Sequence, residues 1–272
     1  MAPQVSGPQS IRESYQRVRE RIAETLERCG RKADDCLLVA VTSKAPPDAI
    51  RTLVEMGHLD LGETEPQQLA QRVVMLEEFL GRRRFLARPT RRDGNNSVPD
   101  KDAVRWHMLG SLGRNKARAI AKWVRLFHQV DTLRMAEELH TVGAKIDQGE
   151  QPRPLEVMLQ VNVTGKAGQP GVTVPAVGPL AEQIDTMVHL RLRGLSVVTP
   201  AGTDPQEARR LYARAAELLE ELRAKRRGGG DLNLLSMGSS DNFETAIEEG
   251  ANIVRVGRAL FGAGAATDAA HR

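Results

Sequence analysis

The amino-acid sequence predicts an α/β fold, a closed (β/α)8 barrel of the TIM type, from three observations. Short apolar runs of strand length alternate with longer segments of helical periodicity along nearly the whole chain. Eight such strand–helix pairs follow one extra N-terminal helix, and this alternation is typical of a parallel sheet. Aromatic residues make up 3% of the 272 residues, so we expect an aliphatic core like those of barrel interiors.

The expected strands are continuous apolar runs, a pattern typical of strands that are buried on both faces. They are predicted at 36–42, 59–61, 104–109, 126–130, 155–163, 190–198, 232–235 and 253–256. The extra helix is predicted over 11–29, where apolar residues recur at spacings of three and four. An open, doubly wound sheet is the alternative. The absence of a GxGxxG motif after the first strand argues against it.

We expect a single barrel domain over residues 1–272, because α/β barrels often reach roughly 250 residues without dividing. Residues 1–9 are expected to form a disordered tail, and 263–272 a second tail. Residues 81–101 contain six arginines and then a Gly-Asn-Asn-Ser stretch, which predicts a mobile basic loop before the third strand. Such a loop is either solvated or a contact for an anion such as nucleic acid.

Composition narrows the class of protein. The formal net charge of +4 does not indicate a nucleic-acid partner, and it suits a small bound anion. No apolar run approaches the ~18 residues of a membrane span, and the N-terminus lacks the apolar core of a signal peptide. Cys29 and Cys36 are too few for a disulfide framework and lack zinc spacing, which indicates buried free thiols in a reducing compartment. We therefore expect a cytoplasmic protein without a membrane partner or a metal.

The loop after the seventh expected strand has the residues of a phosphate site. In α/β barrels, phosphate groups often bind after strands seven and eight. Ser236, Gly238 and Ser239 lie there and lead into a helix that we expect Asp241 to cap. Small residues, hydroxyls and the N–H groups of a helix start suit a phosphate. The alternative is an ordinary capped loop.

The loop after the eighth strand supplies Arg255, Gly257 and Arg258. Arg255 follows two apolar strand residues, where a guanidinium is costly to bury unless it is paired or faces a ligand. Two arginines and a glycine beside the serine-rich loop favour a small-molecule phosphate as the ligand.

Two further residues have both a functional and a purely structural interpretation. Lys44 follows the first strand, and a lysine at a barrel mouth can form a Schiff base with an aldehyde. It could equally be a solvated surface lysine. His107, on the third strand, either contacts a ligand ring from inside the barrel or is a hydrogen-bonded core residue.

These residues together make the chain resemble the pyridoxal phosphate homeostasis protein family over about residues 10–262. No single matching segment is specific to this family, but the whole set of segments in this order is. The matching segments are 38–42, 57–63, 106–110 with 115–116, 130–133, 160–162, 193–195, 235–238 with 240–241, 254–257 and 259–262.

The resemblance implies a barrel like the N-terminal domain of alanine racemase, with pyridoxal 5'-phosphate bonded to a lysine at the end of strand one. It implies that the phosphate is contacted by Ser236, Gly238, Gly257 and the next residue, Arg258. It also implies that Arg255 faces the cofactor near the pyridine nitrogen. The implied function is that of a carrier or regulator in vitamin B6 homeostasis and not of a catalyst. B6-dependent apoenzymes would then be partners.

The chain departs from the family pattern where the cofactor lysine belongs. Ser43 stands at that position, and Lys44 comes one residue late. Because successive strand residues point to opposite faces, Lys44 faces the pocket only if the strand end bulges, or if its long side chain reaches round the rim. Without a bulge, we expect a non-covalent site or none. Thr64 replaces a family asparagine, and Arg258 replaces a small residue, where it either strengthens phosphate binding or fills the site.

Two alternatives to the homeostasis function stay open. One is a degenerate family member that has lost the covalent link and has another binding role. The other is a fold-type III, racemase-like enzyme with minor activity. The second is disfavoured, because such enzymes add a β-rich domain and we expect none in the ten residues after 262.

Overall fold

The computed structural model describes residues 7–86, 104–110, 112, 114–146, 153–200 and 202–262. The strands in this part of the chain are β1 (Leu37–Val41), β2 (Asp60–Glu63), β3 (Arg105–Met108), β4 (Val124–Val130), β5 (Leu155–Asn162), β6 (Val172–Thr173), β7 (Leu190–Ser196), β8 (Leu234–Ser236) and β9 (Ile253–Val256). The helices are α1 (Pro8–Arg28), α2 (Pro47–Glu55), α3 (Pro66–Leu86), α4 (Arg114–Ile120), α5 (Leu133–Ile146), α6 (Val174–Asp185), α7 (Pro205–Ala224), α8 (Phe243–Glu248) and α9 (Arg258–Phe261).

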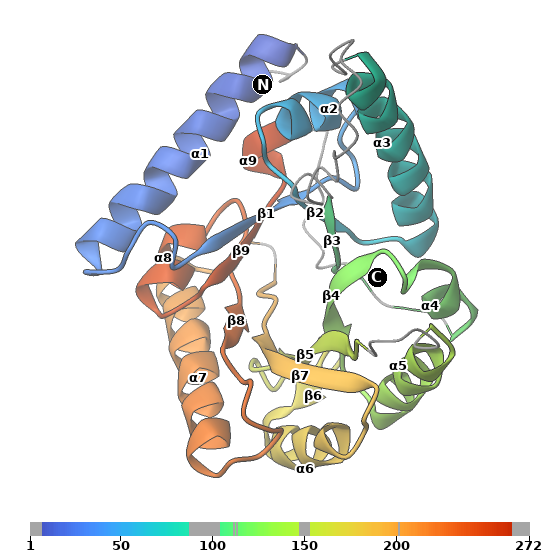
Figure 1. Ribbon diagram of the computed structural model, residues 1–272. Helices are drawn as coiled ribbons and strands as arrows, with labels where there is room; N and C mark the ends of the chain where they lie inside the picture. The colour runs from blue at the N-terminus through green and yellow to red at the C-terminus, as the bar shows by residue number, and fades with distance from the viewer. Residues whose placement is uncertain are drawn as a thin grey trace.

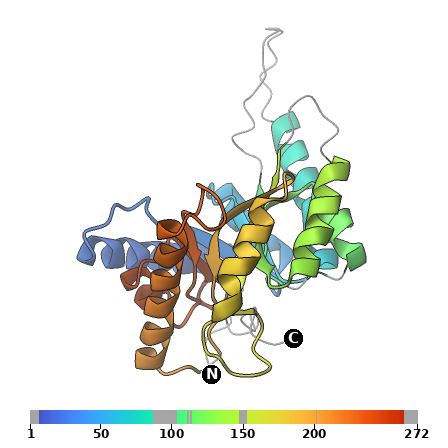
Figure 2. The same cartoon turned by 90° about the horizontal axis from the view of Figure 1, so that it is seen from below.

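The strands close into a barrel, which confirms the predicted (β/α)8 fold (Figure 1). The ring runs β1, β2, β3, β4, β5, β7, β8, β9 and back to β1, and every pairing is parallel. The two-residue strand β6 pairs with β5 outside this ring. The helices surround the strands on the outside (Figures 1 and 2), and α1 packs against α2, α8 and α9.

Alternate residues of each strand face two different cores, which explains why the strands are apolar throughout. Leu38 and Ala40 of β1 belong to the large layer between strands and helices. Val39, between them, packs inside the barrel with Leu126 and Met158. This alternation decides which side chains near the strand ends reach the interior.

Two predicted boundaries are wrong. Helix α1 begins at Pro8, so residues 8 and 9 are helical and do not belong to the tail expected over 1–9. Helix α3 continues to Leu86, so residues 81–86 are not part of a loop. Arg82 forms an ion pair with Glu78 one turn earlier, a contact that favours the longer helix. Residues 1–6, 87–101 and 263–272 of the expected tails and loop lie outside the described residues.

Both cysteines are free thiols. Cys36 is buried, as the sequence indicated, but Cys29 is exposed, so the prediction of burial is wrong for it. Burial raises the pKa of the Cys36 thiol to about 12, although Arg31 and Arg19 act in the opposite direction. Cys36 therefore stays protonated and unreactive. Among the described helices, none combines the length and the apolar character needed to cross a membrane.

Candidate functional site

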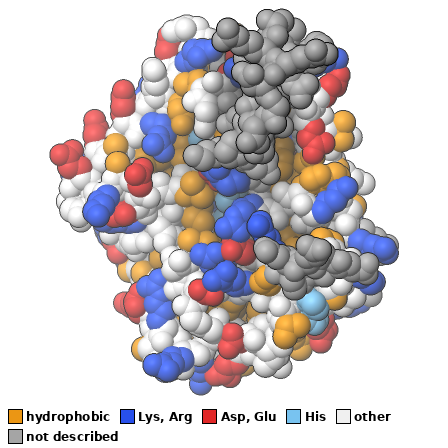
Figure 3. Space-filling view, in the orientation of Figure 1, with side chains coloured by type: hydrophobic (Ala, Val, Ile, Leu, Met, Phe, Trp, Pro, Cys, Tyr) orange, Lys and Arg blue, Asp and Glu red, His pale blue; other side chains and the backbone are white. Residues whose placement is uncertain are grey.

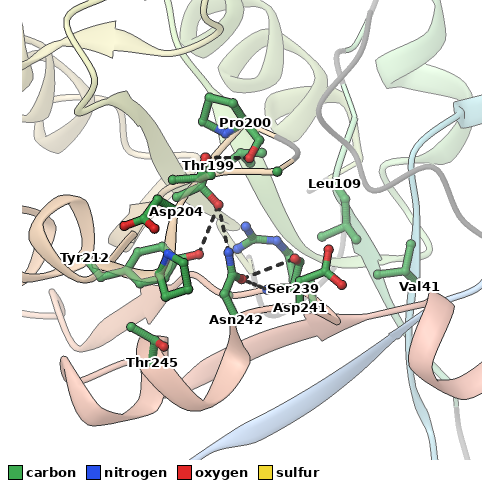
Figure 4. A pocket seen from close by; sticks show the side chains of 16 residues that line it. Val41, Leu109, Thr199, Pro200, Asp204, Tyr212, Ser239, Asp241, Asn242 and Thr245 are labelled. Atoms are coloured by element: carbon green, nitrogen blue, oxygen red, sulfur yellow. Dashed lines mark hydrogen bonds between the residues drawn. The ribbon is translucent and has the colours of Figure 1, made fainter. Parts of the chain in front are cut away.

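A cavity of about 500 Å3 lies at the C-terminal end of the barrel strands (Figure 4). We call it the mouth cavity. Its volume is within the roughly 300–1,000 Å3 of ordinary small-molecule sites. Three predicted site residues line it: Gly238, Ser239 and Arg255. Four others are described but do not line it: Lys44, Ser236, Gly257 and Arg258.

The loop between β8 and α8 is organised by Asn242. Its Oδ1 atom accepts hydrogen bonds from Ser239 N at 2.8 Å and from Ser239 Oγ at 3.2 Å. Its Nδ2 atom donates to Thr199 Oγ1 at 3.1 Å, which ties this loop to the segment after β7 (Figure 4). Asn242 also stands at the N-cap of α8, so the prediction of Asp241 as the cap is wrong. Asp241 instead pairs with Arg258.

Gly238 is required by packing within the protein. Its φ of +92° lies in the region that favours glycine. A Cβ atom there would stand 2.6 Å from Ala246 Cβ and 2.9 Å from Phe243 Cα. The glycine therefore lets the loop lie directly on α8, which fixes the position of the neighbouring Ser239.

Ser240 joins the loops after β8 and β9. Its Oγ atom accepts from Gly257 N at 3.3 Å and from Ala259 N at 3.1 Å. The ion pair between Arg258 and Asp241 spans the same two loops at the rim. Arg258 thus contributes a cation beside the mouth cavity without occupying it.

The segment after β7 supplies cavity residues that the sequence analysis missed. Thr199, Asp204 and Tyr212 all line the cavity. Tyr212 is buried on α7 with its hydroxyl 3.2 Å from Thr199 Oγ1. Asp204 caps α7, where its Oδ1 atom accepts from Gln206 N at 2.9 Å. The position of Thr199 just after a barrel strand could have identified this segment.

The mouth cavity suits an anionic ligand despite the two carboxylates in its wall. Asp204 accepts backbone N–H groups of α7, and Asp241 is paired with Arg258, so both charges are compensated. Buried Arg255 adds a cation to the wall. Backbone N–H groups and hydroxyls of Ser239 and its neighbours provide donors of the kind that bind phosphate.

The end of β1 differs from the arrangement needed to bring Lys44 inward. β1 pairs with β2 and β9 in continuous register, without a bulge. A turn follows, closed by a hydrogen bond from Ala45 N to Thr42 O at 2.9 Å. Lys44 is exposed on this turn. Ser43, half-buried on the same turn, accepts at its Oγ atom from Thr64 N at 3.1 Å.

A buried carboxylate supports this turn from the outside of the barrel. Glu63 Oε1 accepts from Thr42 Oγ1 at 2.6 Å and lies 3.9 Å from Arg72 Nε. Arg72 also donates to Ala45 O at 2.7 Å. Glu63 Oε2 is buried without a hydrogen-bond partner among the described residues. Burial raises the pKa of the Glu63 carboxyl to about 7, although Thr42 and Arg72 lower it.

We expect Glu63→Gln to stabilise the protein at alkaline pH. The folded-state pKa of about 7 exceeds the ordinary value of 4.5, so the native state favours the protonated carboxyl. Its contribution to the free energy of unfolding is complete below the ordinary value and is lost as pH rises through about 7. In denaturant unfolding, the free energy of unfolding of the wild type should fall by roughly 3 kcal/mol between pH 5 and 8. This fall should be absent from Glu63→Gln. Glu77→Gln, at an exposed position of α3, should keep the wild-type profile.

Ser236 and His107 both lie inside the barrel. Ser236 Oγ accepts from Arg255 Nη1 and lies 3.0 Å from His128 Nδ1. His107 is buried and bonded to His128 and to Asp60, so it is a hydrogen-bonded core residue and not part of the mouth cavity. The sequence analysis did not single out His128, because its partners lie on distant strands.

The chain is similar to known proteins over most of its length. The family model for the alanine racemase N-terminal domain matches residues 92–265. The pyridoxal phosphate homeostasis protein of Pseudomonas aeruginosa is 34% identical over 257 residues, which cover 93% of this chain and 96% of that protein. The protein of that name from Mycobacterium leprae is 30% identical over 249 residues, 90% of this chain and 89% of its own. The structure of PipY from Synechococcus elongatus PCC7942 with PLP bound has a TM-score of 0.69 and 28% identity, and covers 89% of this chain and 100% of that one.

Proposed function

Because the chain belongs to the family of pyridoxal phosphate homeostasis proteins, we propose that it binds pyridoxal phosphate (PLP) in the mouth cavity as a carrier or regulator and not as a catalyst. The observation that carries this proposal is the meeting of the Gly238–Ser239 loop with Arg255 in one cavity of about 500 Å3. The PLP-bound structure of PipY supports the choice of ligand.

The phosphate would lie against the loops after β8 and β9. In the described chain, the N–H groups of Ser239, Gly257 and Ala259 donate to Asn242 Oδ1 and Ser240 Oγ. These donors are the ones that a phosphate oxygen can engage by displacing or joining the side-chain acceptors. Arg255 in the cavity wall would face the rest of the ligand.

We propose further that the native chain holds PLP without a stable covalent link. PLP supplies an aldehyde, with which amines combine reversibly. Ser43 stands where the family resemblance places the cofactor lysine, whereas Lys44 is exposed on the turn beyond β1. Lys44 then serves as a rim cation that attracts the anionic ligand, together with Arg258.

A ligand held in this way can be released intact, which suits transfer to B6-dependent apoenzymes as partners. A cytoplasmic location fits this role, and the two free thiols support it, since disulfides are rare in reducing compartments.

Equilibrium titration with PLP, in the presence and absence of inorganic phosphate, tests the proposal. We expect saturable binding that phosphate weakens by competition. We also expect Asp241→Asn to tighten PLP binding by about threefold to tenfold, because it removes a negative charge from the wall and weakens the ion pair that holds Arg258.

Asp34→Asn, at the opposite end of the barrel, is the control and should bind PLP like the wild type. Absence of wild-type binding would overturn the function. Binding that is insensitive to both phosphate and Asp241→Asn would place PLP outside these loops.

A further inference from the structure

A chain of hydrogen bonds crosses the barrel interior from the mouth cavity. Arg255 on β9 donates from Nη1 to Ser236 Oγ on β8, and from Nη2 to Val197 O at 2.7 Å. Ser236 Oγ lies 3.0 Å from Nδ1 of His128, on the far wall of the barrel in β4. All three side chains are buried, with exposed fractions of 8% or less. A guanidinium that lines the mouth is therefore connected to the opposite side of the barrel.

The same series of hydrogen bonds continues to the other end of the barrel. His128 Nε2 lies 3.0 Å from His107 Nδ1, and His107 Nε2 lies 3.2 Å from Asp60 Oδ1. Arg105 donates two hydrogen bonds to the Asp60 carboxylate. Asp60, His107 and Arg105 line a second cavity, of about 400 Å3, at the N-terminal ends of the strands. Figure 3 looks onto this end, where basic and acidic side chains gather near the barrel axis.

The chemistry at the two ends of this series of hydrogen bonds fixes which atoms donate there. Burial alone would raise the pKa of Asp60, but hydrogen bonds from Arg105 and His107 hold it well below its usual range. A carboxylate can only accept, so His107 Nε2 donates to it. Burial, with His107 and Arg255 nearby, holds the pKa of His128 well below its usual value and keeps that ring neutral. Arg255 has only donors, so Ser236 Oγ accepts from its Nη1 atom.

These contacts restrict how Arg255 can lie. Its guanidinium is bonded to Ser236 Oγ and Val197 O, and Ser236 Oγ is in turn held 3.0 Å from His128 Nδ1. An arginine side chain has many rotamers, and a guanidinium already anchored loses less entropy when a ligand binds. Each residue further along the series restrains the rotamer of the residue before it.

We propose that Ser236, His128, His107 and Asp60 are positioning residues, which hold the Arg255 guanidinium toward an anionic ligand in the mouth cavity. This role rests on the proposed function, because PLP is the ligand that reports it. Its consequence is that substitutions near the N-terminal ends of the barrel strands alter affinity at the mouth.

The test replaces His128 with leucine and measures PLP affinity and the absorption band of bound PLP. We expect His128→Leu to raise the Kd about tenfold, through lost preorganisation of Arg255. The band should shift, because the charge beside a bound cofactor tunes its electronic spectrum. His128→Gln, whose amide can both accept and donate, should recover part of the affinity.

His58→Leu is the matched control, since His58 is also buried but meets Asp60 only through the backbone oxygen, 3.0 Å from Nε2. It should stay within about twofold of wild type if it remains folded. In an Arg255→Met background, His128→Leu should add no further loss, because the residue it positions is gone.

A His128→Leu variant that matches His58→Leu in both affinity and spectrum would overturn the inference while leaving the proposed function intact. An equal loss in the Arg255→Met background would also overturn it. A wild-type protein that fails to bind PLP would refute the proposed function, and this positioning role with it.

Discussion

Replacing Ser43 with lysine is expected to give the protein a covalent link to PLP that the native chain lacks. Ser43 stands where the family resemblance places the cofactor lysine, and Val41, two residues earlier, lines the mouth cavity, so we expect a lysine at 43 to reach the ligand. After borohydride reduction, mass spectrometry should find one cofactor per chain on residue 43. We also expect slower dissociation of PLP from Ser43→Lys than from wild type.

The controls separate position 43 from its neighbour. The Ser43→Lys, Lys44→Ala double variant should keep the adduct, and wild type should show little adduct at Lys44. Loss of the two hydrogen bonds that Thr64 donates to Ser43 Oγ is a modest cost, about 1 kcal/mol each, so the variants should fold. A stoichiometric adduct on Lys44 in wild type would contradict this account, because it requires an exposed turn residue to enter the cavity.

Gly238→Ala is expected to damage stability and binding together. The new Cβ combines a positive φ with contacts of 2.6 Å to Ala246 and 2.9 Å to Phe243, so the loop must leave α8. We expect a loss of roughly 2–4 kcal/mol in the free energy of unfolding. Displacement of Ser239 should weaken PLP binding at temperatures where the variant is still folded.

Gly230→Ala is the matched control, because an added Cβ there meets no atom within 4 Å and its φ is not in the glycine region. Its unfolding midpoint in denaturant and its PLP affinity should equal those of wild type within error. If Gly238→Ala behaves in the same way, the loop is not held against α8 as described.

The barrel could be predicted from the sequence because its signals are local. Apolar runs such as 36–42 and 253–256 are buried on both faces whatever their partners, and the structure has β1 and β9 there. The exact helix limits were less predictable. Residues 81–86 look like a basic loop, yet Arg82 and Glu78 lie one turn apart and the helix continues.

The candidate site was predictable only in part, because much of it depends on long-range contacts. The serine-rich loop and Arg255 could be found from their place after barrel strands. The contact between His128 and Ser236 joins residues 108 positions apart, and no local pattern records it. The orientation of Lys44 likewise depended on whether β1 bulges, which pairing with β2 and β9 decides.

A crystal structure of the wild-type protein with PLP tests the central claim most directly. We expect the phosphate within hydrogen-bond distance of the backbone N–H groups of Ser239 and Gly257. The ring should lie beside Arg255, with no bond to any lysine. Density that joins PLP to Lys44, or places it outside the mouth cavity, would contradict the account.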